Sequence, residues 1–406
     1  MRQDLTVRAA VRGKLKDLAK EMVSWEVLPR IDDKEEERIK RAIQPYSHTT
    51  SRENLIIAGV DGTGDFPSLS YGDSFIYVTL AQGTRYQADR VSGLREVAPE
   101  LDPLIEFTWL PEDDSQARQA LDAAFESLAG APVADVIGRS DYRELKQRGS
   151  GKKSSVAELA DNLIRPHATD TGNIAIQLRS SAELGAALRL ITDEPTPKYV
   201  LLDSTFSLPF VNRARLSLFF EHLKRLCCVE ARKCGVGFFA LSKSHGMPAM
   251  EHVERLSGAA MGMEERQKAE HWFLRIPVQG RDGWELSLIE NRHVPPAAAV
   301  SYLVRFHKNT PIMRLDMDLE YWEKFVLADT PQKTLVNERR IFEDLDYVSH
   351  DQRAYGYPYP IKAGHDRASL THAERVALRK MIIDAAVSEG MRPQLFRNVS
   401  QATGHG

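Results

Sequence analysis

The sequence predicts an α/β fold in which helices cover a mixed β-sheet. From about residue 174, helical and strand-like segments alternate along the chain, as in "SSAELGAALRLI", "KYVLLDSTF", "NRARLSLFFEHLKRLCCVEARKCG" and "VGFFALSKS". Alternation of this kind favours a sheet whose strands are joined by crossover helices. Upstream, "LIIAGVDGTGD" and "DSFIYVTLAQGTRY" are rich in β-branched and aromatic residues. They predict antiparallel strands at one side of the same sheet.

The remaining segments are predicted in order. Residues 7–42 are predicted to be helical, so that 1–50 forms an N-terminal helical segment and 51–406 the main domain. An acid-rich stretch at about 87–162 reads as a mostly helical insertion, whereas "HWFLRIP", "AVSYLVRFHK" and "IMRLDMDLE" add strands. The last helix begins at Thr371, where Glu374 completes a capping box, and it closes before Gly390.

Composition limits the class of protein. Hydrophobic residues make up 42% and charged residues 27% of the chain, as in ordinary globular proteins. No apolar run is long enough to span a membrane, and residues 1–11 lack an apolar signal core. The three cysteines, Cys227, Cys228 and Cys234, lack metal-ligand spacing and predict reduced thiols in a cytoplasmic protein. With 54 Lys+Arg against 57 Asp+Glu, the chain would not hold nucleic acid by charge alone.

Two acids follow apolar strand-like runs, and each has two interpretations. Asp61 follows "LIIAGV" and precedes glycine, and Asp-Gly is a common hairpin signal, so Asp61 could simply shape a turn. Asp203 follows "YVLL" and could face solvent at a strand end. However, an acid beside a buried strand is costly unless it is paired or bound to metal. Two such acids favour a site where carboxylates converge on divalent ions and cleave phosphodiesters.

Glu183 and His365 are further candidate ligands. "SSAE" at 180–183 fits a capping box, in which Glu183 would bond the amide at the start of a helix. An acid on the first turn of a helix beside the sheet could equally point at a metal. A single histidine such as His365 is more often structural than a ligand. Oxygen ligands suit magnesium or manganese, and an imidazole among them favours manganese.

The order of the motifs resembles the NurA family of nucleases, which have a ribonuclease-H-like fold. In sequence order the motifs are "GVDGTGD", "RSSAEL", "VLLDSTF", "ALSKS", "SYLVRFHKNTPIMRLDMDLE" and "GYPYPIKAGHDRA". The matching region runs from about residue 55 to 369 and is interrupted at 87–162. It implies a ribonuclease-H-like mixed sheet flanked by helices.

The resemblance also implies roles for individual side chains. Asp61, Glu183, Asp203 and His365 would hold the metal. Lys243 of "ALSKS" would face the phosphate, and Tyr302 of "SYLVRF" matches the family's active-site tyrosine. "DGT" replaces "DGS", "DSTF" lacks the glycine after the acid, and "GH" replaces "AH". Every implied ligand side chain is present, so we expect an active enzyme.

As a whole, the resemblance implies a manganese-dependent deoxyribonuclease, with magnesium as the second choice of metal. It would act as a 5′–3′ exonuclease and single-strand endonuclease. NurA-type enzymes form homodimers and work with the hexameric ATPase HerA, so we expect a homodimer that acts with a HerA-type ATPase. The pathway would be DNA end processing or antiviral defence. One alternative is a NurA-like interaction subunit that caps or regulates the ATPase with little cleavage of its own. A nuclease directed at RNA is the other.

Overall fold

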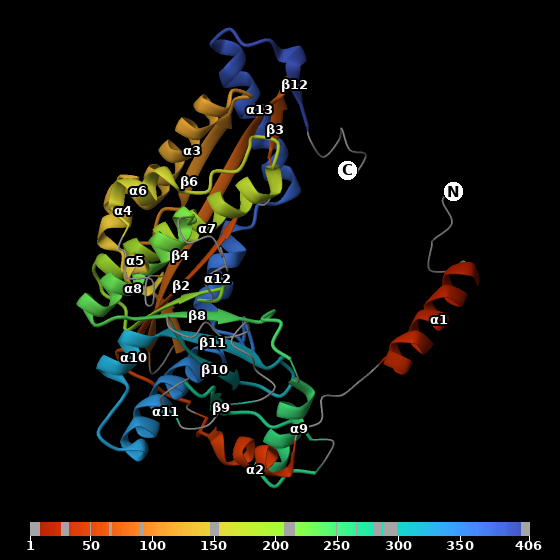
Figure 1. Ribbon diagram of the computed structural model, residues 1–406, viewed down its shortest axis with the longest axis vertical. Helices are drawn as coiled ribbons and strands as arrows, with labels where there is room; N and C mark the ends of the chain where they lie inside the picture. Colours follow the sequence, from red (N-terminus) through yellow and green to blue (C-terminus); the bar gives the residue numbers. More distant parts are fainter. Residues whose placement is uncertain are drawn as a thin grey trace.

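A computed structural model shows helices on both faces of one large mixed sheet (Figure 1). It describes residues 9–25, 32–48, 50–64, 67–89, 93–146, 154–206, 216–248, 250–264, 267–278, 282, 286 and 299–398. The helices of these residues are α1 (Ala9–Trp25), α2 (Asp33–Ala42), α3 (Asp114–Ala129), α4 (Val133–Arg139), α5 (Tyr142–Lys146), α6 (Val156–Asp161), α7 (Thr171–Thr192), α8 (Phe219–Cys234), α9 (Met250–Ala260), α10 (Leu319–Phe325), α11 (Pro331–Val348), α12 (Tyr359–Ala368) and α13 (His372–Ser388). The strands are β1 (Ile43–Pro45), β2 (Ile56–Thr63), β3 (Leu69–Tyr71), β4 (Ser74–Asp89), β5 (Gly93–Glu96), β6 (Leu104–Leu110), β7 (Tyr199–Leu202), β8 (Gly237–Ser242), β9 (Trp272–Arg275), β10 (Ala299–Arg305), β11 (Met313–Asp318) and β12 (Phe396–Arg397).

The centre of the sheet has the strand order β6-β4-β2-β7-β8. β6, β4 and β2 pair in antiparallel fashion, whereas β2, β7 and β8 are parallel to one another. Helix α7 leads into β7, and α8 connects β7 to β8. This order confirms the predicted ribonuclease-H-like mixed sheet. Beyond β8 the sheet continues through β11, β10 and β9 to β1, all antiparallel.

Alternate residues of the central strands bury their side chains in two separate cores. Val60, Val200 and Leu202 pack with α3, α7 and α8 on one face. Ile57 and Leu201 pack on the other face with residues of α11 and α12. Strands covered on both faces read as continuous apolar runs, which is why β7 is visible in the sequence as "YVLL".

Two predicted segments differ from the structure. Within the described residues, the stretch 87–162 is helical only from α3 onward, because residues 87–89 end β4 and residues 93–96 and 104–110 form β5 and β6. β6 pairs with seven residues of β4 and belongs to the central sheet. The N-terminal segment 1–50 also contributes a strand, β1, which pairs with β9. Both strands were missed because short or edge strands carry little periodicity.

The last helix agrees with its prediction. α13 begins after Thr371, whose side chain accepts a hydrogen bond from Glu374 N, and Glu374 completes the capping box. Cys227 and Cys228 are buried in α8 and Cys234 is exposed at its end; all three are free thiols. Within the described residues, none of the helices combines the length and apolarity needed to cross a bilayer.

Candidate active site

Asp61 and Asp203 occupy neighbouring positions on parallel strands. Val60 of β2 is paired with Leu202 of β7, and the two acids are the next residue on each strand. Residues in register point to the same sheet face, so both carboxylates lie on the face covered by α12. β2 continues through Asp61 to Thr63 and stays paired with β4, so the interpretation of Asp61 as a turn residue is wrong.

His365 reaches Asp61 because α12 lies unusually close to the sheet. A methyl group on Gly59 would lie 2.3 Å from the carbonyl carbon of Pro360, and one on Gly364 would lie 3.2 Å from the amide nitrogen of Asp61. Only glycine allows backbones to approach this closely. One residue after Gly364, the Nδ1 atom of His365 lies 2.7 Å from Oδ2 of Asp61. The structure therefore brings the C-terminal histidine to the first acid, 304 residues away in sequence.

Glu183 lies in the middle of α7 and caps nothing. The helix begins at Thr171 with Asp170 as its N-cap, so the predicted capping box at 180–183 is wrong. The N-cap of the motif would be Ser180, whereas the observed N-cap is Asp170, so the helix starts ten residues earlier than that motif indicated. The Glu183 carboxylate is largely buried and pairs with Arg179, whose Nε lies 3.5 Å away.

A second glycine lets Glu183 lie close to β2. A methyl group on Gly62 would lie 2.8 Å from Cγ of Glu183 and 3.1 Å from its Oε1. Gly62 N also donates a hydrogen bond to Oδ1 of Asp61 at 2.8 Å. The missing side chain at position 62 is therefore what allows the third acid to approach this strand.

Lys243 and Tyr357 surround Asp203. Lys243 follows β8 directly, and its Nζ lies 3.7 Å from Oδ2 of Asp203 and 3.8 Å from the centre of the Tyr357 ring. The Tyr357 hydroxyl is buried beside Asp203, just outside hydrogen-bond geometry. Burial and the charges of Asp203 and Asp61 raise the pKa of Tyr357 well above its ordinary value. Sequence reasoning missed Tyr357, although it lies in the quoted motif "GYPYP".

Tyr302 does not lie with the acids. It is fully buried in β10, and its hydroxyl donates a hydrogen bond to Oε1 of Glu338 at 2.8 Å. β11 and β8 separate β10 from β7 in the sheet. Arg275 completes this buried group, with its Nε 3.1 Å from the same Glu338 oxygen. The structure thus places Tyr357, and not Tyr302, beside the candidate ligands.

The donor set fits a hard divalent cation. Three carboxylates and one imidazole come from β2, α7, the end of β7 and α12. Burial, followed by the negative charge of Asp61, raises the pKa of Asp203, whereas Lys243 and His365 oppose the rise. A cation would offset both unfavourable effects, and the buried Tyr357 hydroxyl offers a further polar group. The donor atoms of these four side chains do not all lie within 4.8 Å of one another. Among the described residues, a different group meets that distance: His48, His271, Asp346 and His350.

Comparison with known proteins finds likeness in solved structures. No protein-family model and no curated protein matches the chain. The chain is similar to the NurA nuclease from Sulfolobus solfataricus, with 12% identity over 94% of this chain and 96% of that one, at a TM-score of 0.45. A structure of NurA bound to dAMP and manganese shows 12% identity over 97% of this chain and 100% of that one, at a TM-score of 0.34.

Endonuclease V from Streptomyces avermitilis is also similar, with 8% identity over 87% of this chain and 96% of that one, at a TM-score of 0.27. These likenesses name the family that the motif order resembles. Sequence identities and TM-scores this low do not assign an activity to this chain.

Proposed function

We propose that this chain is a divalent-metal-dependent nuclease that hydrolyses phosphodiester bonds in DNA. The observation that carries the proposal is the meeting of Asp61, Asp203 and His365 at one end of the parallel strands, with Glu183 approaching through Gly62. Acids and an imidazole drawn from four separate elements are hard to explain as an accident of packing, because clustered carboxylates repel one another and lose hydration.

The metal would be held by Asp61, Glu183, Asp203 and His365. When bound, it would polarise the phosphate, activate a water molecule and stabilise the leaving oxygen. Carboxylate oxygens suit magnesium or manganese, and the imidazole favours manganese. Arg179 pairs with Glu183 and thereby orients this carboxylate toward β2.

The remaining groups bind and orient the substrate. Lys243 is half-exposed, so its ammonium group can contact a phosphate oxygen while it stays near Asp203. Tyr357 packs its ring under that ammonium group and keeps its hydroxyl protonated, because its pKa is raised. A protonated hydroxyl beside Asp203 can donate a hydrogen bond to this carboxylate or to substrate. Both residues position the phosphate and the acid without taking up protons themselves.

The finer activity follows from the motif resemblance. We infer a manganese-dependent 5′–3′ exonuclease and single-strand endonuclease that works as a homodimer with a HerA-type hexameric ATPase, in DNA end processing or antiviral defence. The charge balance supports a partner of this kind, because a chain with net charge −3 attracts DNA weakly. A translocating ring would feed the duplex to the nuclease and replace the missing electrostatic attraction.

The first experiment tests the chemistry. Asp61→Ala and Asp203→Ala should each lower manganese-dependent DNA cleavage on the order of 10³-fold while they leave the fold intact. Asp329→Ala is the matched control, since this acid is exposed in the loop between α10 and α11. Cleavage by Asp61→Ala at the wild-type rate would refute the proposed nuclease. The alternative would then be an interaction subunit that caps or regulates the ATPase.

The second experiment tests the partner. We expect the chain to co-elute in size-exclusion chromatography with the ATPase encoded beside its gene, and long duplex to be degraded only with ATP at physiological salt. Separate elution and no effect of ATP would contradict the partnership while the nuclease itself could stand. RNA and DNA substrates of equal length, compared in the same assay, decide which polymer is preferred.

A further inference from the structure

A second group of metal-ligating side chains lies near the β1–β9 edge of the sheet. It consists of His48, His271, Asp346 and His350, whose donor atoms lie within 4.8 Å of one another. His48 follows β1, His271 precedes β9, and the other two lie at the end of α11. Four strands separate β9 from β2 in the sheet order, so this group is distinct from the candidate active site.

The three imidazoles surround one carboxylate. Nδ1 of His48 lies 2.8 Å from Oδ2 of Asp346, and Nδ1 of His271 lies 3.0 Å from Oδ1. Nδ1 of His350 lies 3.4 Å from Oδ1 of the same side chain. In a tetrahedral site with bonds of about 2.0–2.1 Å, ligand atoms are separated by about 3.3 Å. The observed nitrogen-to-oxygen distances of 2.8–3.4 Å are equal to that separation within 0.1 Å for His350 and shorter by 0.3–0.5 Å for the other two imidazoles.

Burial and charge in this group favour a cation. The Asp346 side chain is fully buried, whereas His350 is mostly buried and His48 is partly exposed. The Tyr46 hydroxyl is buried and lacks a partner in hydrogen-bond geometry.

The backbone fixes the ligands in place. Antiparallel pairing of β1 with β9 continues to a hydrogen bond from Tyr46 N to His271 O at 2.9 Å. His271 has φ = 58°, in the left-handed region that residues other than glycine adopt at a cost. Asp346 lies in the last turn of α11, and His350 follows the C-cap Ser349, where its Nδ1 donates a hydrogen bond to Asp346 O at 2.9 Å. A strained residue, a strand pair and a helix end thus converge on one point.

We propose that His48, His271, Asp346 and His350 bind a zinc-class divalent ion that ties the N-terminal segment, β9 and α11 together. Three nitrogen donors and one carboxylate oxygen are typical of zinc, whereas magnesium and calcium require mostly oxygen. The ion is structural: it compensates the buried Asp346 charge and joins segments about 300 residues apart (350 − 48 = 302).

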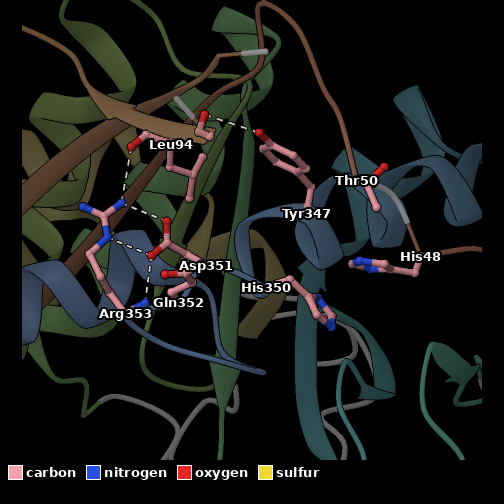
Figure 2. A pocket seen from close by; sticks show the side chains of 9 residues that line it. His48, Thr50, Leu94, Tyr347, His350, Asp351, Gln352 and Arg353 are labelled. Carbon is pink, nitrogen blue, oxygen red and sulfur yellow. Dashed lines mark hydrogen bonds and ion pairs between the residues drawn. The ribbon is translucent and has the colours of Figure 1, made fainter. Parts of the chain in front are cut away.

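A pocket gives the ion a path to this site. His48 and His350 line one end of a cavity of about 630 Å³, and Asp351 and Arg353 form an ion pair at the other end (Figure 2). Tyr347, one residue after Asp346, lines the pocket between them. An ion can therefore reach the imidazoles from solvent without unfolding of β1 or α11.

The experiment counts metal and measures stability on the full chain. Purified protein is stripped with a chelator, exposed to Zn²⁺, desalted and measured by inductively coupled plasma mass spectrometry. All samples carry Asp61→Ala and Asp203→Ala, so that zinc at the candidate active site does not contribute. We expect about one equivalent of zinc, a thermal midpoint that falls on stripping and recovers with zinc, and visible absorption of tetrahedral cobalt when Co²⁺ replaces it.

Ligand variants and a matched control decide the result. His48→Gln keeps a hydrogen-bond donor for Asp346 but should weaken zinc binding about 10- to 100-fold, and His350→Ala should abolish the cobalt spectrum. His167→Ala is the control, because this histidine is also solvent-accessible but lies before α7. If the unaltered cluster binds no more zinc than His48→Gln, or if zinc does not raise its thermal midpoint, the proposal is overturned. His48→Gln covers the case in which His350→Ala fails to fold.

Discussion

Gly59→Ala tests whether the close approach of α12 to β2 positions the active site. The added methyl group would lie 2.3 Å from the carbonyl carbon of Pro360, whereas carbon atoms in contact are normally about 3.5 Å apart or more. The start of α12 must therefore move by about 1.2 Å (3.5 − 2.3). Because His365 lies on the same helix, this shift carries its Nδ1 away from Asp61, which it now approaches to 2.7 Å.

The magnitude follows from that displacement. Overpacking of this kind costs about 1–3 kcal/mol of stability. A misplacement near 1 Å at a catalytic site costs roughly 10²-fold in rate. We therefore expect Gly59→Ala to lower both the free energy of unfolding and the rate of manganese-dependent cleavage. The variant would still be mostly folded, so the loss of rate should exceed the loss of folded protein.

Two further glycines calibrate the assay. Gly364→Ala brings a methyl group to 3.1–3.2 Å from backbone atoms of Gln82 and Asp61, so its effect should be smaller. Gly172→Ala in the first turn of α7 meets no atom within 4 Å and should be neutral or stabilising by up to about 1 kcal/mol. Urea unfolding and initial cleavage rates are measured for all three variants. Wild-type stability and rate in Gly59→Ala would refute the reasoning.

Three more predictions concern single side chains. Glu183→Gln should lower cleavage on the order of 10³-fold without lowering the thermal midpoint, because an amide replaces a charged ligand at a position that caps nothing. Tyr357→Phe should reduce cleavage in kinetic assays, whereas Tyr302→Phe should leave cleavage intact and cost about 1–3 kcal/mol in urea unfolding, because Glu338 loses a buried hydrogen bond and keeps only those to Arg275 and Trp322 on that oxygen. The folded protein holds the Asp203 proton more tightly than the unfolded chain, since burial raises its pKa. In metal-free protein this contribution to stability is therefore lost as pH rises from 3.8 through the folded pKa, and Asp203→Asn should remove that loss in unfolding measured across pH.

The sequence pointed to the two candidate acids that follow buried strands. Asp61 and Asp203 stand out because an apolar run ends in an acid, and that pattern follows directly from the cost of burying charge. His365 and Lys243 had no such signal of their own and were found only through the order of motifs. The structure then placed both beside the two acids.

Other features depend on tertiary contacts that a linear pattern does not encode. The capping motif at Glu183 was locally plausible, but α7 begins ten residues earlier, and burial against β2 decides the outcome. Tyr302 and Tyr357 both lie in quoted motifs. Only the packing of β10 and of the segment that leads into α12 shows which of the two tyrosines lies beside the acids. The His48 cluster draws on three segments far apart in sequence, so neither spacing nor periodicity indicated it.

The contact between His365 and Asp61, which spans 304 residues, has a consequence during protein synthesis. A ribosome makes the chain from its N-terminus, so β2, α7 and β7 emerge long before α12. Until His365 has left the exit tunnel, Asp61 lacks its imidazole partner and the helix that lies against β2. In the proposed nuclease, a nascent or prematurely terminated chain would carry an incomplete metal site. The order of the proposed ligands along the chain would thus delay cleavage until nearly the whole sheet has been made.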